Sequence, residues 1–432
     1  MCILLRGEGM KTPKVIPGTG GAFGGISPEL NAFGIPVACC TDRPSGIRMD
    51  VGTFAFSIPI GTCLACSFNE PLQENLFEMV GIELRRNKID SLLGPGMNLH
   101  RNPLNGRNFE YFSEDPFLTG KIASAQVKGM HKHQLTGTIK HFIANNQEHQ
   151  IYFSNGVISE RPIRELYLKG FEIACREAGA YCIMTTYGPV NGLWTASNYD
   201  LLTHILRKEW EYEGVVMTDW WARGNEEGED SSKQEFAAMV RSQNDLYMVT
   251  KDAITNSNND NLATSLHTDK LTLGELQRSA MNVLKVIMRM LVMDRYLDCE
   301  DQSYKELYEQ TEVYEIKEAG VLIDVDCMGC IPTEYIGIRD KTRNIYKFVC
   351  HESGDYQLEF NVRASGVSEA AQMSMSVWKD NEFIYTISMN GSQTDFRTAT
   401  VELGNLKSGS TKIELFFRKD GMEINSCKII KK

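Results

Sequence analysis

The stretch Gly214-Val215-Val216-Met217-Thr218-Asp219-Trp220-Trp221 is an apolar run that stops at one carboxylate followed by two aromatic side chains. Apolar and β-branched residues at successive positions are typical of a parallel strand that is buried on both faces. In barrels of parallel strands, functional side chains gather at the carboxyl ends of the strands. Asp219 is therefore a candidate functional acid, and an aspartate that only caps the following segment is the alternative.

Similar short apolar runs recur along the chain, and helical periodicity separates them. They predict strands over residues 36–42, 91–98, 137–142, 181–187 and 245–250. Apolar residues spaced near 3.6 predict helices over 71–90 and 159–177, and a long helix over 271–297. Alternating strands and helices predict a parallel sheet with crossover helices. The pattern indicates an α/β protein with a (β/α)8-type barrel, in which two strands stay unassigned.

The carboxy-terminal quarter of the chain has a different pattern. Seven runs of period two predict strands over 344–350, 356–364, 372–378, 383–389, 397–403, 412–417 and 423–430. Turn residues such as Asn390-Gly391 and Asp420-Gly421 separate them. Short alternating strands without helices predict an antiparallel β-sandwich. The expected organisation is a linker-like segment over 1–25, the barrel over 26–297, a connector over 298–320 and the sandwich over 321–432.

Composition limits the possible partners. The chain has 432 residues, a hydrophobic fraction of 42% and a formal net charge of −11. An acidic protein is a poor partner for nucleic acid, and no apolar run reaches membrane length. The first residues lack the cationic and apolar regions of a secretory signal, so a cytoplasmic location is expected.

Twelve cysteines include two Cys-x-x-Cys pairs, Cys63/Cys66 and Cys327/Cys330. A zinc or redox site needs more ligands than these two pairs supply, since they fall in different predicted domains. We therefore expect neither a metal nor a cofactor.

Polar groups follow five successive predicted barrel strands. They are Asp42, Arg107, the pair Lys140-His141, Tyr187 and Asp219. Helix caps alone would supply Ser, Thr and Asn more often than these residue types. Parallel strands would bring them to one rim of the barrel.

At these residues the sequence resembles glycoside hydrolase family 3. The matching segments are Thr41-Asp42-x-Pro44-Ser45-Gly46-Ile47-Arg48, Gly106-Arg107-Asn108-Phe109-Glu110-x-Phe112-Ser113-Glu114-Asp115-Pro116, Lys140-His141-Phe142, Tyr187 to Asn191-Gly192, and Leu206-Arg207-x-x-Trp210 leading to Asp219-Trp220. The resemblance implies a retaining, exo-acting hydrolase, most often a β-glucosidase, that acts on an oligosaccharide or glucoside. It also implies Asp219 as the nucleophile, with Asp42, Arg107, Lys140, His141 and Tyr187 around the terminal sugar.

The chemistry of the side chains fits these implied roles. A retaining mechanism needs a carboxylate close to the anomeric carbon, as Asp219 would provide. Asp42 can accept from sugar hydroxyls, while Arg107, Lys140 and His141 can donate to them; a structural ion-pair network is the alternative.

Two aromatic residues near Asp219 have open roles. Tyr187 either orients the nucleophile or caps the barrel core. Trp220 either stacks on a sugar or fills the core.

The source of the acid/base carboxyl is a separate question. The resemblance implies that it comes from an α/β-sandwich domain, which some family members place before the barrel. Residues 6–10 and 17–21 resemble a linker into the barrel of such a permuted enzyme, so we expect this chain to be the second half of one. Glu110, Glu114 and Glu148 are the barrel carboxylates that could serve instead, although fixing their loops is the expected role.

The predicted sandwich loosely resembles carbohydrate-binding modules, in Gly354-Asp355-Tyr356-x-Leu358-x-Phe360-x-Val362 and the last strand. Trp378 and Tyr385 are its candidate rings for a glycan, and a domain that only packs against the barrel is the alternative. For the whole chain, the alternative to an enzyme is a non-catalytic glycan-binding protein or an inactive fragment.

Overall fold

A computed structural model shows two compact units, which divide between Tyr308 and Glu309. It describes residues 1–9, 20–42, 44–48, 55–301, 323–326, 329–331, 342–366, 372–380, 382–390, 394–417 and 421–432. The division falls inside the predicted connector 298–320, of which only 298–301 lie among the described residues. Each unit is considered by itself.

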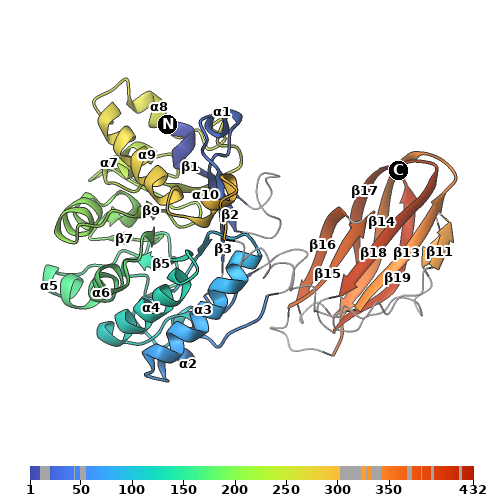
Figure 1. The fold of residues 1–432 in the computed structure, drawn as a ribbon, viewed down its shortest axis with the longest axis horizontal. Coiled ribbons are helices and arrows are strands. Elements are labelled where there is room, and N and C mark those ends of the chain that lie inside the picture. Colours follow the sequence, from blue (N-terminus) through green and yellow to red (C-terminus); the bar gives the residue numbers. More distant parts are fainter. Residues whose placement is uncertain are drawn as a thin grey trace. The chain divides into compact units, whose positions relative to one another are not determined.

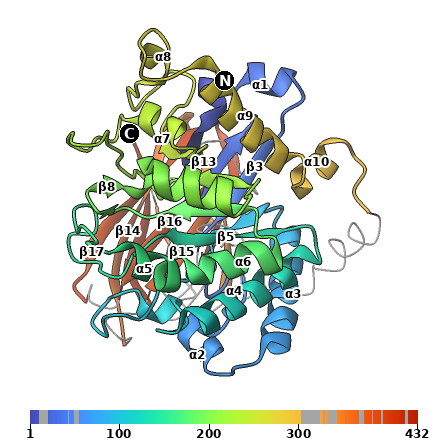
Figure 2. The same ribbon diagram turned by 90° about the vertical axis from the view of Figure 1, so that its left-hand side faces the viewer.

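The first unit is a nearly closed barrel of eight strands in the order β10-β1-β2-β3-β4-β5-β6-β9 (Figures 1 and 2). A parallel bridge from Met217 to Leu246 connects the two ends of this order. All pairs are parallel except those of β2, which runs antiparallel to β1 and β3. The strands are β1 (Arg6–Gly9), β2 (Gly21–Gly24), β3 (Val37–Thr41), β4 (Ser91–Leu92), β5 (Thr136–Phe142), β6 (Cys182–Thr185), β9 (Val215–Met217) and β10 (Tyr247–Thr250).

Helices connect and cover the barrel strands. Side chains cap several of them: Asn69 caps α3, Asp115 caps α4, and Thr272 with Glu275 forms a capping box on α9. The helical segments are η1 (Cys2–Leu5), α1 (Pro28–Ala32), α2 (Gly61–Ala65), α3 (Glu70–Arg86), η2 (Asn108–Glu110), α4 (Pro116–His131), α5 (Glu160–Pro162), η3 (Ile163–Tyr167), α6 (Lys169–Ala178), η4 (Thr195–Ser197), η5 (Asp200–Glu209), α7 (Phe236–Arg241), α8 (Leu262–Ser265), α9 (Leu273–Ile287) and α10 (Leu291–Tyr296). A small hairpin, β7 (Pro189–Val190) with β8 (Leu193–Trp194), follows β6.

Six strands of the barrel match the predicted runs, so the predicted fold class is confirmed. All seven residues of β5 are buried, as expected for a strand covered on both faces. The predicted long helix over 271–297 is wrong, because α9 ends at Ile287 and α10 begins at Leu291. Tight i to i+3 bonds at Arg289 and Met290 end α9. Apolar residues continue through this turn, so their spacing in the sequence did not indicate that the helix ends there.

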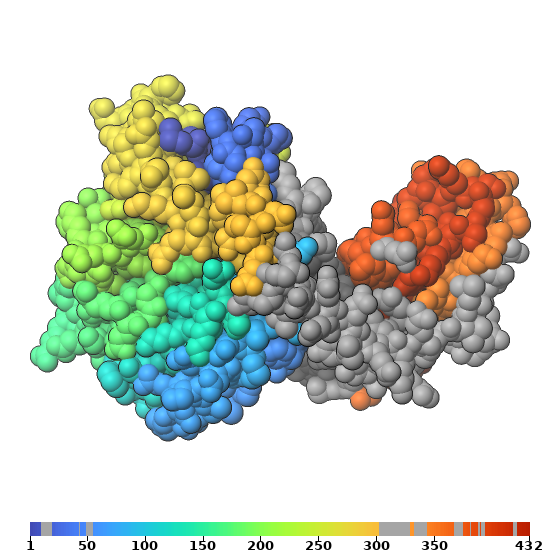
Figure 3. All heavy atoms as spheres, in the orientation of Figure 1, coloured from blue at the N-terminus to red at the C-terminus, as the bar shows by residue number. Residues whose placement is uncertain are grey.

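The prediction of a linker over residues 1–25 is also wrong for the described part. Arg6–Gly9 and Gly21–Gly24 are β1 and β2, the two barrel strands that the sequence left unassigned. Arg6 is buried in this strand and pairs with Asp260 at 2.6 Å. A Cβ on Gly7 would lie 2.1 Å from Met248 Sδ, so this glycine permits close packing rather than flexibility. In Figure 3 the amino-terminal segment lies beside α9, which packs against η1 and β2.

The second unit is a β-sandwich of two sheets, as predicted. One has the order β11-β13-β18-β15-β16 and the other β12-β19-β14-β17. Pairing is antiparallel except between β11 and β13. The strands are β11 (Ile323–Asp326), β12 (Cys330–Ile331), β13 (Thr342–Cys350), β14 (Gly354–Ala364), β15 (Gln372–Lys379), β16 (Glu382–Asn390), β17 (Arg397–Leu406), β18 (Gly409–Phe417) and β19 (Met422–Lys431).

Strict alternation of buried and partly exposed side chains explains why these strands could be predicted. In β14, Tyr356, Leu358, Phe360 and Val362 are buried in the sandwich core, while the residues between them are partly exposed. The seven predicted runs correspond to β13 through β19. The two short strands β11 and β12 were not predicted.

Candidate active site

Asp219 lies two residues beyond β9, at the carboxyl end of the barrel, and is buried. The backbone N–H of Trp220 donates to Asp219 Oδ1 at 2.7 Å, and the Tyr187 hydroxyl also hydrogen-bonds to the carboxylate. Burial raises the pKa of Asp219, while the charges of Arg107 and Lys140 oppose that rise. Asp219 is thus an acid removed from bulk water whose anion two cations support.

Lys140, near the end of β5, connects Asp219 to Asp42, which follows β3. Its Nζ donates to Asp42 Oδ1 at 3.2 Å. The Lys140 side chain is buried, whereas that of Asp42 is 43% exposed. Because Asp42 keeps its carboxylate partly in solvent, it is accessible to an incoming polar ligand.

Arg107 lies in the loop after β4 and is held on two sides. Its Nε donates to Glu110 Oε1, and its Nη2 donates to His141 Nε2 at 2.8 Å. Glu110 therefore fixes the Arg107 guanidinium, as the sequence suggested. The other acids of this loop have local roles: Glu114 accepts from the Ser113 hydroxyl, and Asp115 caps α4.

His141 follows Lys140 on β5 and is almost fully buried. Burial lowers the pKa of its imidazole well below the ordinary value, and the charges of Arg107 and Lys140 lower it further. Nε2 lies 3.6 Å from Asp219 Oδ2, but a neutral ring makes no ion pair there. The structure thus brings His141 into the cluster, with both ring nitrogens in contact with protein groups. That His141 donates to a sugar stays a prediction.

Aromatic residues lie next to Asp219 in space or in sequence. The rings of Tyr187 and Tyr152 are 4.7 Å apart, and the Tyr187 hydroxyl reaches the carboxylate. Trp220 is partly buried against the barrel core, whereas Trp221 is 49% exposed. Tyr187 thus lies where it can orient the Asp219 carboxylate. Part of the Trp220 ring is buried by packing against the barrel core.

Four further residues of this rim had no assigned part in the predicted cluster. Asn98 contacts His141, Tyr111 lies 3.3 Å from His141 Nδ1, and Asn145 bridges Tyr111 and Glu148. Burial raises the pKa of Glu148, and both Glu110 and Asp219 raise it further while Arg107 lowers it. Asn98 ends the predicted strand 91–98 and Asn145 follows the predicted strand 137–142 closely, which was the available signal, but amides at strand ends are common in structural roles. Tyr111 lies too far from a predicted strand end to be found in this way.

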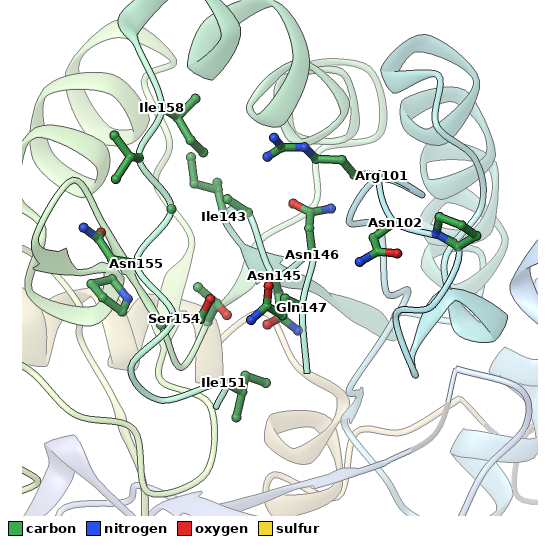
Figure 4. Close-up of a pocket in the computed structure, with 17 residues that line it drawn as sticks. Arg101, Asn102, Ile143, Asn145, Asn146, Gln147, Ile151, Ser154, Asn155 and Ile158 are labelled. Carbon is green, nitrogen blue, oxygen red and sulfur yellow. The ribbon is translucent and has the colours of Figure 1, made fainter. Parts of the chain in front are cut away.

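A separate hollow of about 540 Å³ lies beside this cluster, among the loops after β4, β5 and β6 (Figure 4). Amide side chains dominate its polar lining: Asn102, Asn145, Asn146, Gln147 and Asn155. Asn145 belongs to both regions, since its Nδ2 donates to Tyr111 Oη at 3.0 Å. Asp219 does not line the hollow.

Within the described residues, His, Cys, Asp and Glu do not form a group of three or more that could hold a metal ion. Cys63, Cys66 and Cys330 are exposed, and Cys327 lies outside the described residues. Among the described helices, none combines the length and hydropathy needed to cross a membrane.

Comparison with known proteins agrees with this geometry. Residues 26–286 match the family described as "Glycosyl hydrolase family 3 N terminal domain". The chain belongs to glycosyl hydrolase family 3.

Individual relatives match most of the chain or nearly all of it. A beta-glucosidase of Ruminococcus albus is 47% identical over 98% of this chain and 44% of its own length. The crystal structure of a beta-glucosidase from Paenibacillus barengoltzii is 41% identical with a TM-score of 0.67, covering 99% of this chain and 46% of that one. Beta-glucosidase 3B from Thermotoga neapolitana, solved with alpha-D-glucose, is 29% identical with a TM-score of 0.62, covering 76% and 48%. The chain thus spans less than half the length of each of these relatives.

Proposed function

We propose that this chain carries the sugar-binding and nucleophilic half of a retaining β-glucosidase that acts on terminal β-linked glucose-like residues. The observation that carries the proposal is the buried Asp219 carboxylate, which Arg107 and Lys140 support electrostatically at the carboxyl end of the barrel. An anion in this position can attack an anomeric carbon and form a glycosyl-enzyme that water later hydrolyses. The names of the relatives support the choice of a β-glucoside as substrate.

The terminal sugar would lie between Asp219 and the partly exposed Asp42. Asp42 would accept from two sugar hydroxyls, and Lys140 and Arg107 would donate to neighbouring ones. Tyr187 would hold the Asp219 carboxylate in its attacking orientation, and Trp220 would present its ring to the sugar. The contacts of Asp42, Lys140, Tyr187 and Asp219 with one another in the free protein support this arrangement.

We propose that the acid/base carboxyl comes from a complementary α/β-sandwich domain or chain. Glu110 is held by Arg107, which leaves Glu148 as the nearby acid that could deliver a proton. Glu148 is half-buried and is tied to Asn145 at 3.3 Å, which suits it to fixing its loop. The chain spans 44% of the length of the Ruminococcus albus relative, which leaves room in that relative for a further domain.

The experiment compares two substrates on the purified 432-residue chain, cellobiose and dinitrophenyl β-glucoside. General acid assistance is worth about a hundredfold to ten-thousandfold, and a dinitrophenolate leaving group needs little of it. The proposal predicts turnover of the aryl glucoside, poor cleavage of cellobiose, and formation of glucosyl azide when azide is added. Asp219→Asn is the matched inactive control.

Other outcomes would overturn parts of the proposal. Efficient cellobiose cleavage that Glu148→Gln abolishes would show that the barrel supplies its own acid. Tight binding of gluconolactone without turnover of the aryl glucoside, even with azide, would show a non-catalytic glycan-binding protein.

A further inference from the structure

Asn98 lies beyond β4 and is almost fully buried against the backbone of His141. His141 N–H donates to Asn98 Oδ1 at 2.9 Å, and Asn98 Nδ2 donates to the His141 carbonyl at 2.8 Å. This pair of bonds fixes the orientation of the amide, because a flipped amide would place donor against donor and acceptor against acceptor. Asn98 therefore presents an oxygen, and not a nitrogen, to this side of His141.

The same oxygen faces the imidazole. Asn98 Oδ1 lies 3.1 Å from His141 Nδ1, and an amide oxygen can only accept. Nδ1 therefore carries a proton. The Tyr111 oxygen, 3.3 Å away, is also able to accept from that proton.

The other ring nitrogen completes the argument. Arg107 Nη2 lies 2.8 Å from His141 Nε2, and a guanidinium can only donate. Nε2 must therefore be unprotonated. Nδ1 faces a group that can only accept, and Nε2 faces a group that can only donate. Both contacts therefore indicate the same neutral tautomer, with its proton on Nδ1.

We propose that Asn98 is a positioning residue, which holds His141 as the neutral Nδ1–H tautomer so that Nε2 accepts from Arg107 and gives no proton to Asp219. The inference deepens the proposed function, on which its catalytic consequence rests. With Nε2 unprotonated, His141 neither pairs with the nucleophile at 3.6 Å nor repels Arg107. Asp219 keeps its negative charge for the sugar, and the Arg107 guanidinium is fixed by Glu110 on one side and by His141 on the other.

The charged and titratable groups around His141 come from three elements. Arg107 and Tyr111 come from the loop after β4, Lys140 from β5 itself, and Asp219 from the end of β9. Arg107 and Lys140 disfavour a positive imidazole, while Asp219 would favour one. Because the Asn98 amide is uncharged, it does not stabilise a positive imidazole, and the ring stays neutral. A carboxylate at position 98 would shift the protonation equilibrium of His141 toward the imidazolium form.

The test uses nitrogen NMR of the histidine side chains in the full chain, with the His141 signals assigned by their loss in His141→Gln. The proposal predicts a protonated Nδ1, an unprotonated Nε2, and no titration between about pH 5 and pH 8. A proton on Nε2, or an imidazolium near neutral pH, would overturn it. This measurement needs no turnover, so it is independent of the proposed function.

The variant Asn98→Asp supplies the second readout. It should raise the pKa of His141, protonate Nε2 and pair it with Asp219. We expect kcat/KM for the aryl glucoside to fall at least about tenfold at pH 6, with the acidic limb of the profile moved to higher pH. Asn244→Asp is the control, since Asn244 is equally buried but bonds to Thr185.

The outcomes separate positioning from a merely structural role. An unchanged pH profile and an unchanged His141 titration in Asn98→Asp, or the same shift in Asn244→Asp, would overturn the proposal. If the parent chain shows no turnover, His141 titration in Asn98→Asp alone decides: a higher pKa than in the parent supports positioning, and an equal one refutes it.

Discussion

The two ends of the barrel each hold a buried aspartate, and the two are used differently. Asp245, just before β10 at the amino end, accepts from Arg207 at 2.5 Å, from Asn282 at 2.9 Å and from the N–H of Val216 at 3.0 Å. Asp219, at the carboxyl end, accepts from the Trp220 N–H and Tyr187, and its cations act from the surrounding cluster. Saturated hydrogen bonding marks Asp245 as structural, whereas Asp219 keeps capacity for a ligand.

The same contrast separates the barrel from the sandwich. Within the described part of the sandwich, Glu414 is the only buried charged side chain, and Lys412 pairs with it at 2.5 Å. The barrel buries several charges at its carboxyl end, among them Lys140, Glu110 and Asp219. Buried charges also lie elsewhere in the barrel, such as Asp90 and Asp245, so burial alone does not mark a site. The group at the carboxyl end differs because Asp42 beside it stays partly exposed, and we expect the chemistry there.

The largest expected effect is that of Asp219→Asn on activity. Loss of the proposed nucleophile should reduce turnover of an activated aryl β-glucoside by at least about a thousandfold, on the order of 4 kcal/mol or more. Stability should not fall at pH 8, because the pKa of Asp219 is raised in the folded state and ionisation above it costs folding free energy. Single-turnover kinetics measure the loss of activity, and urea unfolding measures the stability. Turnover within about threefold of the parent would remove Asp219 from the mechanism.

Asp245→Ala should show the opposite pattern. The substitution removes the carboxylate that pairs with the buried Arg207 and breaks three hydrogen bonds. We therefore expect a loss of about 3 to 5 kcal/mol in the unfolding free energy of the barrel. The fraction that stays folded should bind gluconolactone as the parent does. Weakened binding by folded protein, together with unchanged stability, would contradict the structural assignment.

Asp42→Ala tests whether the partly exposed Asp42 carboxylate, at the carboxyl end of the barrel, binds sugar. Removing this acceptor should weaken gluconolactone binding by roughly 2 to 4 kcal/mol, since sugar hydroxyls lose a charged partner. Titration calorimetry measures the change, with Glu114→Ala on the neighbouring loop as a matched control. Equal affinities for parent and Asp42→Ala would show that Asp42 only pairs with Lys140.

The smallest expected effect concerns Glu83, away from both aspartates. Burial raises the pKa of Glu83 to about 7, although the N–H of Phe56 donates to it. The folded protein thus binds a proton more tightly than the unfolded chain, and stability falls as pH rises from about 4.5 toward 7. Glu83→Gln should gain about 1 to 2 kcal/mol at pH 8 and little at pH 4. A gain that does not depend on pH would contradict the cause given.

The sequence predicted those parts of the fold in which local pattern and packing agree. Runs such as Val215 to Met217 and the alternation in β14 are buried where the pattern requires it. By contrast, β1 has the sequence Arg6-Gly7-Glu8-Gly9, which contains no apolar residue. Its stability depends on Asp260 and Met248, more than 200 residues away, and no local pattern could indicate those partners.

The candidate site shows the same limit. Asp42, Arg107, Lys140, His141, Tyr187 and Asp219 were predicted to share a rim, and the structure brings them together there. Their roles toward a sugar stay predictions. The bond from Arg107 to His141, and the amide of Asn98 behind it, depend on how the long loop after β4 folds back onto β5, which strand order alone does not determine.

The central claim is that Asp219 becomes glycosylated, and trapping measures this directly. Incubation of the full chain with dinitrophenyl 2-deoxy-2-fluoro-β-glucoside should leave one fluoroglucosyl group, and mass spectrometry of the digest should find it on Asp219. Asp219→Asn should stay unlabelled under the same conditions. A label on another carboxylate, such as Glu148, or steady hydrolysis of the parent substrate without any trapped intermediate, would contradict the account.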